Sequence, residues 1–252
     1  MLMMNIKKYI PNIATLGNLF CGTMAAVFAA EGAFKLTAIL VILGVIFDFF
    51  DGFLARILNV SEELGKQLDS LADIVTSGVV PGVVMFSMLN NSTPILNMEN
   101  TDSMAWISLN IKWIQLFGLL LTLSAAYRLA KFNIDTKQTS SFIGLPTPAM
   151  SLFVVSLPLI ADTTRENAIK EMIHNPLFLL SITLFLSYLM NSNLKLLSLK
   201  FKNYSVKEHL FEYLLILISI VLILTLDILA IPLIISVYIV LSIVQNLVQK
   251  NL

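Results

Sequence analysis

The sequence predicts an all-α membrane protein, a polytopic bundle of about eight transmembrane helices with a short N-terminal amphipathic segment. Three observations support this fold class. Hydrophobic residues make up 57% of the 252 residues and charged residues only 13%, whereas charged residues form about a quarter of a typical soluble domain. The apolar residues occur in runs of about 20, the length that a helix needs to cross a bilayer. These runs lack the alternation of polar and apolar residues that a membrane strand requires.

Eight apolar runs bounded by polar clusters mark the expected helices. They cover about residues 12–30, 35–57, 68–89, 111–130, 143–161, 175–191, 209–227 and 229–248. Before the first run, Ile6, Tyr9 and Ile10 lie beside Lys7 and Lys8, which is typical of a short helix in the membrane interface. Because little chain remains between the runs, we expect one integral membrane domain over residues 1–252.

The placement of basic residues predicts which side of the membrane each joint faces, because cytoplasmic loops are rich in Lys and Arg. With eight spans both termini share one side, and twelve of the 16 basic residues fall on it. The joint after the second run lies on the same side. We therefore expect both termini and this joint on the cytoplasmic face of the cytoplasmic membrane, in contact with membrane lipids. The 16 acidic residues balance the 16 basic ones, so bulk charge gives no reason to expect nucleic-acid binding.

Four aspartates occur where the second and third runs reach this face, although a charge at membrane depth costs about 2.5–3.5 kcal/mol. At about 100° per residue, the polar and small residues near the end of the second run share one helix face, and those near the start of the third run share another. Only 12 residues separate Arg56 from Asp69, so we expect antiparallel neighbours whose faces meet. The first face carries Asp48, Asp51, Gly52, Ala55 and Arg56, and the second carries Gly65, Asp69 and Asp73.

Such a group of carboxylates predicts a metal site, because the four charges would repel one another without cations. Oxygen ligands without Cys or His favour Mg²⁺ or Mn²⁺, and two divalent ions would balance four charges. A dinuclear site can bind a pyrophosphate and stabilise displacement at phosphorus. Arg56 would offer a planar fork to phosphate oxygens. An intramembrane salt-bridge network is the plainer alternative, but one arginine cannot neutralise four carboxylates.

The spacing D-x2-D-G-x2-A-R-x8-G-x3-D-x3-D, from Asp48 to Asp73, resembles the signature of the CDP-alcohol phosphotransferase family. The resemblance implies transfer of a phosphatidyl or similar group from a CDP-linked lipid to an alcohol, with release of CMP. It implies two divalent metals on the four aspartates, Asp73 also as the base for the acceptor hydroxyl, and a homodimer. For CDP-diacylglycerol we expect contacts with Asn12, Thr15, Gly52, Ala55, Arg56 and Gly65.

Further motifs in residues 11–22, 127–133 and 142–149 resemble the bacterial branch that uses L-serine as the acceptor, the CDP-diacylglycerol:serine O-phosphatidyltransferases. This likeness implies a product pair of phosphatidylserine and CMP. We expect residues 10–160 to form the catalytic core and residues 170–252 to add transmembrane helices. The same transfer to another alcohol, such as glycerol 3-phosphate or an inositol phosphate, is the alternative.

The serine carboxylate needs a cationic partner, and Arg128 is our choice because a guanidinium binds a carboxylate bidentately, with Lys131 near it. A topological anchor and a ligand for lipid phosphate are the alternatives for Arg128. A hypothesis from another class is a divalent-cation transporter, since intramembrane carboxylates also mark ion paths. A transporter, however, should carry acidic groups near the bilayer midplane on several broken helices.

Two smaller features complete the prediction. Gly78 and Gly82 form a small-xxx-small pair in the third run, which suits either a dimer contact or close packing within the bundle. Asp227 falls at the tight joint between the last two runs, where a turn residue is expected.

Overall fold

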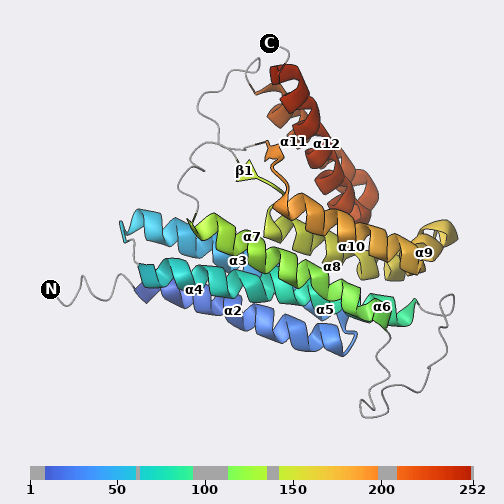
Figure 1. The fold of residues 1–252 in the computed structure, drawn as a ribbon, viewed down its shortest axis with the longest axis horizontal. Helices are drawn as coiled ribbons and strands as arrows, with labels where there is room; N and C mark the ends of the chain where they lie inside the picture. Colours follow the sequence, from blue (N-terminus) through green and yellow to red (C-terminus); the bar gives the residue numbers. More distant parts are fainter. Residues whose placement is uncertain (1–8, 61–62, 93–112, 135–141, 198–208, 251–252) are drawn as a thin grey trace.

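The structure is a computed structural model that describes residues 9–60, 63–92, 113–134, 142–197 and 209–250, and these ranges are almost wholly helical (Figure 1). The expected amphipathic segment lies mostly outside the described residues. The N-terminal half consists of α2 (Tyr9–Ala30), α3 (Phe34–Ile57), α4 (Glu63–Ile74), η1 (Val75–Val79), α5 (Val80–Asn91), α6 (Trp113–Leu116), η2 (Phe117–Leu119) and α7 (Leu120–Ile134). The C-terminal half consists of β1 (Phe142–Ile143), α8 (Thr147–Thr163), α9 (Asn167–His174), α10 (Pro176–Asn191), β2 (Lys195–Leu196), α11 (Leu210–Leu226), η3 (Asp227–Leu229) and α12 (Ala230–Lys250).

The helix ends follow from local sequence. Gly32, with φ 74°, takes the left-handed conformation that ends α2 and lets α3 turn back. Asn175 caps α10, because its Oδ1 accepts a hydrogen bond from the amide of Leu177 at 2.9 Å. Pro176 occupies the first position of α10, where no amide donor is needed.

The described chain contains five helices that are long and apolar enough to cross a membrane, or six if α9 and α10, bent by 67°, form one span. This confirms a multi-pass membrane protein, whereas the number of eight spans stays a prediction. α8 has 17 residues and measures about 26 Å, slightly less than the bilayer core of about 30 Å. The apolar segment Leu210–Val248 is 39 residues long, but it folds back at Asp227, and α11 packs beside α12 (Figure 1).

The fifth predicted helix begins later than expected. Residues 142–143 form β1, which pairs antiparallel with β2, instead of the first turn of a helix. Gly144, with φ 72°, and Pro146 explain the difference, because both disfavour a helix across these positions. The all-α prediction is therefore correct except for this two-residue pair.

Polar side chains of α12 hold the strand segment of residues 195–197. Tyr238 Oη donates to the carbonyl of Leu197 at 3.1 Å, and Asn246 Nδ2 donates to the carbonyl of Lys195 at 2.7 Å. Ser242 Oγ accepts from the amide of Leu197 at 3.1 Å. These side chains stand four residues apart and so share one face of α12. The hairpin of α11 and α12 is thus held to residues 195–197 by hydrogen bonds between its side chains and their backbone.

The pair Gly78 and Gly82 packs within the bundle. A Cβ on Gly78 would lie 3.2 Å from the Cβ of Ala125, and one on Gly82 would collide with Thr122 Oγ1. Thr122 Oγ1 also donates to the carbonyl of Gly78 at 2.9 Å. These glycines therefore serve the contact with α7, which is one of the two alternatives that the sequence left open.

The fold predicts that Gly118 tolerates no larger residue. A Cβ there would lie 2.6 Å from the amide nitrogen of Phe86 and 2.9 Å from the carbonyl carbon of Met85, and backbone atoms cannot move aside as a side chain can. We expect Gly118→Ala to destabilise the protein by about 1–3 kcal/mol, measured as thermal unfolding in detergent.

Gly17→Ala is the control, because its new Cβ would meet only the ring of Phe47, at 3.1 Å, which is partly exposed and can turn. Equal melting temperatures for the two variants would contradict the close approach of η2 to α5.

Candidate active site

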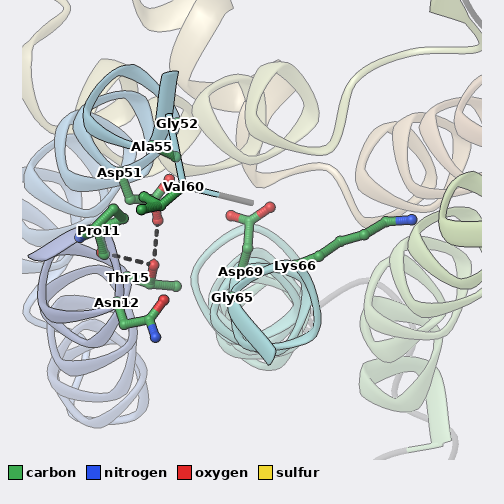
Figure 2. A pocket seen from close by; sticks show the side chains of 10 residues that line it. All are labelled: Pro11, Asn12, Thr15, Asp51, Gly52, Ala55, Val60, Gly65, Lys66 and Asp69. Atoms are coloured by element: carbon green, nitrogen blue, oxygen red, sulfur yellow. Dashed lines mark hydrogen bonds between the residues drawn. The ribbon is translucent and has the colours of Figure 1, made fainter. Parts of the chain in front are cut away.

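The signature residues lie on α3 and α4, and both helices pack against α2. Asp48 and Asp51 stand on α3 and Asp69 and Asp73 on α4. The prediction that the second and third spans face one another therefore needs a refinement, since α2 contacts both helices. The carboxylates of α3 and α4 meet beside α2 at one end of the bundle (Figure 2).

Three carboxylates form a tight group. Oxygen atoms of Asp48, Asp51 and Asp69 all lie within 4.8 Å of one another. Asp51 is buried, and Oδ1 of Asp69 is buried without a hydrogen-bond partner among the described residues. A buried carboxylate oxygen without a donor, next to other carboxylates, is suited to a hard divalent cation such as Mg²⁺ or Mn²⁺. The donor set present here thus fits the predicted metal.

Asp73 stands one turn further along α4. Its Oδ1 accepts a hydrogen bond from Asn18 Nδ2 at 3.3 Å. Its carboxylate also interacts with those of Asp48, Asp51 and Asp69. All four predicted aspartates therefore meet in one place, three as a compact group and the fourth tied to α2.

Thr15 fixes the carboxylate of Asp51 from α2. Its Oγ1 lies 2.6 Å from Asp51 Oδ2 and 3.1 Å from the carbonyl of Pro11 (Figure 2). A threonine hydroxyl carries one proton, and the shorter contact to an ionised group is the stronger bond. Asp51 is thereby oriented by a neutral donor, not by a cation.

A pocket of about 280 Å³ opens beside Asp51 and Asp69, between α2, α3 and the start of α4 (Figure 2). Five of the six residues predicted to contact CDP-diacylglycerol line this pocket, and Arg56 does not. Sequence reasoning did not single out Pro11, Val60 or Lys66. The full lining consists of Pro11, Asn12, Thr15, Asp51, Gly52, Ala55, Val60, Gly65, Lys66 and Asp69.

The two signature glycines play different parts. A Cβ on Gly52 would meet nothing within 4 Å, so this position keeps open space in the pocket. A Cβ on Gly65 would lie 3.1 Å from Asn12 Oδ1 and would press against α2. Gly52 therefore gives clearance to a bound molecule, and Gly65 permits the close contact of α4 with α2.

Arg56 lies at the edge of the site. Its Nε donates to the carbonyl of Gly52 at 3.0 Å, on its own helix. The predicted contact with the CDP moiety would require the guanidinium to swing toward the pocket.

Arg128 and Lys131, predicted for serine, line a second and separate pocket with Phe132, Ile143 and residues 190–192. Its volume of about 20 Å³ is close to the space of a single water. Arg128 Nη1 donates to the carbonyls of Ile143 at 2.9 Å and Met190 at 2.6 Å. The guanidinium thus ties α7 to β1 and to the end of α10.

The end of α7 nevertheless reaches the wall of the first pocket. Lys66 Nζ donates to the carbonyl of Asn133 at 3.2 Å, and Asn133 Nδ2 donates to Ser70 Oγ at 2.8 Å. These bonds connect α4 with α7, close in sequence to Lys131.

Residues 8–191 match the sequence profile of the CDP-alcohol phosphatidyltransferase family. The chain belongs to this family. As a CDP-alcohol phosphatidyltransferase it transfers a phosphatidyl-type group from a CDP-linked donor to an alcohol, and enzymes of the family use divalent metal. The resemblance read from the signature is thereby confirmed.

Individual CDP-alcohol phosphatidyltransferases are similar to the chain over most of its length. A CDP-diacylglycerol–serine O-phosphatidyltransferase of Bacillus subtilis is 31% identical over 188 residues, 75% of this chain and 89% of the relative. The Helicobacter pylori protein of the same name is 30% identical over 213 residues, 84% of this chain and 80% of the relative. An archaetidylserine synthase of Methanothermobacter thermautotrophicus is 28% identical over 165 residues, 62% of this chain and 63% of the relative.

The carboxylate group predicts tight Mn²⁺ binding that depends on Asp51 and Asp69. We expect the double variant Asp51→Asn, Asp69→Asn to lose affinity at least about 10-fold, because even the outer-shell partners of metal ligands contribute about 10- to 100-fold. Electron paramagnetic resonance of free Mn²⁺ in titrations of the purified protein measures this.

Asp162→Asn is the matched control, since it removes an exposed carboxylate at the far end of α8. Unchanged Mn²⁺ affinity in the double variant would show that the group does not hold metal.

Proposed function

We propose that the protein transfers the phosphatidyl group of CDP-diacylglycerol to the hydroxyl of L-serine and releases phosphatidylserine and CMP. The observation that carries this proposal is the group of Asp48, Asp51 and Asp69 beside a pocket lined by signature residues. The similar Bacillus subtilis and Helicobacter pylori proteins are serine O-phosphatidyltransferases, which supports serine as the acceptor. Transfer to glycerol 3-phosphate or an inositol phosphate is the alternative within the family.

The four aspartates would hold two Mg²⁺ or Mn²⁺ ions. When bound, these ions would neutralise the pyrophosphate oxygens of the donor and stabilise charge at the reacting phosphorus. The gathering of the carboxylates at one end of two helices, together with family membership, favours the transferase over a cation transporter.

The donor would bind in the 280 Å³ pocket. Asn12 and Thr15 from α2, with Ala55 from α3, would contact its CDP moiety, and Gly52 and Gly65 would admit it close to the helix backbones. Arg56 would reach the pyrophosphate by exchanging the carbonyl of Gly52 for a phosphate oxygen.

Asp73 would act as the general base. The serine oxygen attacks phosphorus while Asp73 accepts its proton, a new P–O bond forms, and the bond to the CMP oxygen breaks. We expect direct displacement, because the residues that line the pocket include no Cys or His to form or activate a covalent nucleophile.

The distribution of basic residues predicts that the joint after the second run is cytoplasmic. This joint connects the end of α3 with the start of α4, beside the pocket (Figure 1), so the pocket would face the cytoplasmic side of the cytoplasmic membrane. Membrane lipid would surround the eight proposed spans. A homodimer would use a surface other than Gly78 and Gly82, which pack against α7.

Wild-type protein is expected to release CMP from CDP-diacylglycerol with L-serine and Mn²⁺, and more slowly or not at all with glycerol 3-phosphate or inositol phosphate. Asp73→Asn should lower kcat about 10²- to 10⁴-fold, the usual contribution of a general base. CMP release with each alcohol measures the acceptor preference, and radiolabelled serine followed into lipid measures kcat. Near-normal turnover by Asp73→Asn would refute the assignment, and preference for another alcohol would replace serine by that acceptor.

Arg128 Nη1 donates to the carbonyls of Ile143 and Met190. We propose that the rest of the guanidinium binds the serine carboxylate, with Lys131 adding positive charge. Arg128→Lys should raise the KM for serine about 10-fold or more, as lost bonds to a charged group cost about 1.5–3 kcal/mol. The KM for CDP-diacylglycerol should stay near wild type. A fall in thermal stability with both KM values unchanged would leave Arg128 as a tie between helices only.

A further inference from the structure

Asn18 on α2 joins Asp73 to Thr76 inside the bundle. Asn18 is 1% exposed and Thr76 is 1% exposed, so both side chains are shielded from bulk water. Thr76 Oγ1 donates to Asn18 Oδ1 at 2.7 Å, and Asn18 Nδ2 donates to Asp73 Oδ1 at 3.3 Å. Three side chains thus form a buried chain that ends on the proposed base.

The chain has a defined direction. Thr76 Oγ1 lies 2.7 Å from Asn18 Oδ1 and 3.2 Å from the backbone carbonyl oxygen of Asn18. Its single proton bonds to the nearer amide oxygen, which leaves the amide nitrogen of Asn18 for Asp73. The opposite amide orientation would place the Asn18 oxygen against a carboxylate, an acceptor against an acceptor. Thr76 therefore decides which end of the Asn18 amide meets the base.

The backbone around Thr76 is shaped for this contact. Thr76 belongs to the π-helical turn η1, which begins two residues after Asp73. Such turns are rare and are frequent at functional sites. Ser151 Oγ on α8 donates to the carbonyl of Thr76 at 3.4 Å, so this backbone group also has a partner.

Two glycines make room for the pair. A Cβ on Gly22 would collide with Thr76 Oγ1 and lie 2.9 Å from Thr76 Cα. A Cβ on Gly44 would lie 2.8 Å from Thr76 Cγ2 and 2.9 Å from Asn18 Oδ1. α2 and α3 therefore close tightly around the two side chains, which leaves them little freedom to turn.

We propose that Asn18 and Thr76 are positioning residues that hold the carboxylate of Asp73 for proton transfer, an inference that rests on the proposed role of Asp73 as the base. The Asn18 amide occupies Oδ1 and turns the second oxygen toward the acceptor hydroxyl. Neither residue lines the pocket, and both are buried, so their proposed action on the reaction passes through Asp73.

The test compares Thr76→Val, which keeps the shape and removes the hydroxyl, with Thr76→Ser, which keeps the hydroxyl. Thr76→Val should lower kcat about 10-fold or more, since a misplacement of about 1 Å can cost 10²-fold. The KM values for CDP-diacylglycerol and serine should stay near wild type. The melting temperature should fall, because the buried Asn18 Oδ1 loses its donor. Thr76→Ser should restore most of kcat.

A double-variant cycle isolates the route through Asp73. Adding Thr76→Val to Asp73→Asn should lower kcat little further, because Asn18 and Thr76 then have no base to position. Asn18→Leu is similar in shape but has no donor or acceptor, so it should lower kcat as Thr76→Val does. If Thr76→Val does not fold, Asn18→Leu tests the inference in its place.

Three results would overturn the inference. They are wild-type kcat in Thr76→Val, full additivity in the cycle, or a rise in both KM values together with the loss of kcat in both the Val and Ser variants. Failure of the proposed function would look different, because wild-type protein would then release no CMP with serine, or release it faster with another alcohol.

Discussion

The close approach of carboxylates from α3 and α4 is the constraint on which the rest of the site depends. Asp48, Asp51 and Asp69 bring negative charge within 4.8 Å at the edge of an apolar bundle. The side chains of α2 that donate hydrogen bonds to Asp51 and Asp73 are Thr15 and Asn18, both neutral. A lysine or arginine there would cancel the charge that attracts a divalent ion. α2 therefore orients the carboxylates and leaves their charge available.

Close backbone approach makes this arrangement possible. Gly65 lets α4 lie against Asn12, and Gly22 lets α2 lie against the π-helical turn. Each contact would be lost with a single added methyl group, because protein interiors leave no spare volume. Gly52 stands apart from these, since a Cβ there would meet nothing and the space belongs to the pocket. Small residues in the signature thus serve two needs, helix packing and ligand clearance.

Much of the fold and the site could be predicted from sequence because periodicity and spacing are local. The apolar runs located the helices, and the interval from Asp48 to Asp73 brought Gly52, Ala55 and Gly65, three of the six residues expected to contact the CDP-linked donor, to one pocket. Contacts between residues far apart in the sequence could not be predicted. Asn18 meets Asp73 across 55 positions and Arg128 meets Met190 across 62, and no local pattern encodes such pairs. The β1–β2 pair could not be predicted for the same reason, since β2 lies far along the chain. Only Gly144 and Pro146 indicated that the fifth helix begins later.

The hydrogen bonds from α12 to residues 195–197 have a consequence for the order in which the protein is synthesised. A ribosome completes residues 9–191 well before it reaches Tyr238, Ser242 and Asn246. Until then the carbonyls of Lys195 and Leu197 lack the donors that hold them in the finished protein. The residues that gather the carboxylates are all synthesised first, whereas the β1–β2 pair gains its outer support last. The order of synthesis therefore makes all the carboxylates and their α2 partners available before the α12 side chains that support the β1–β2 pair.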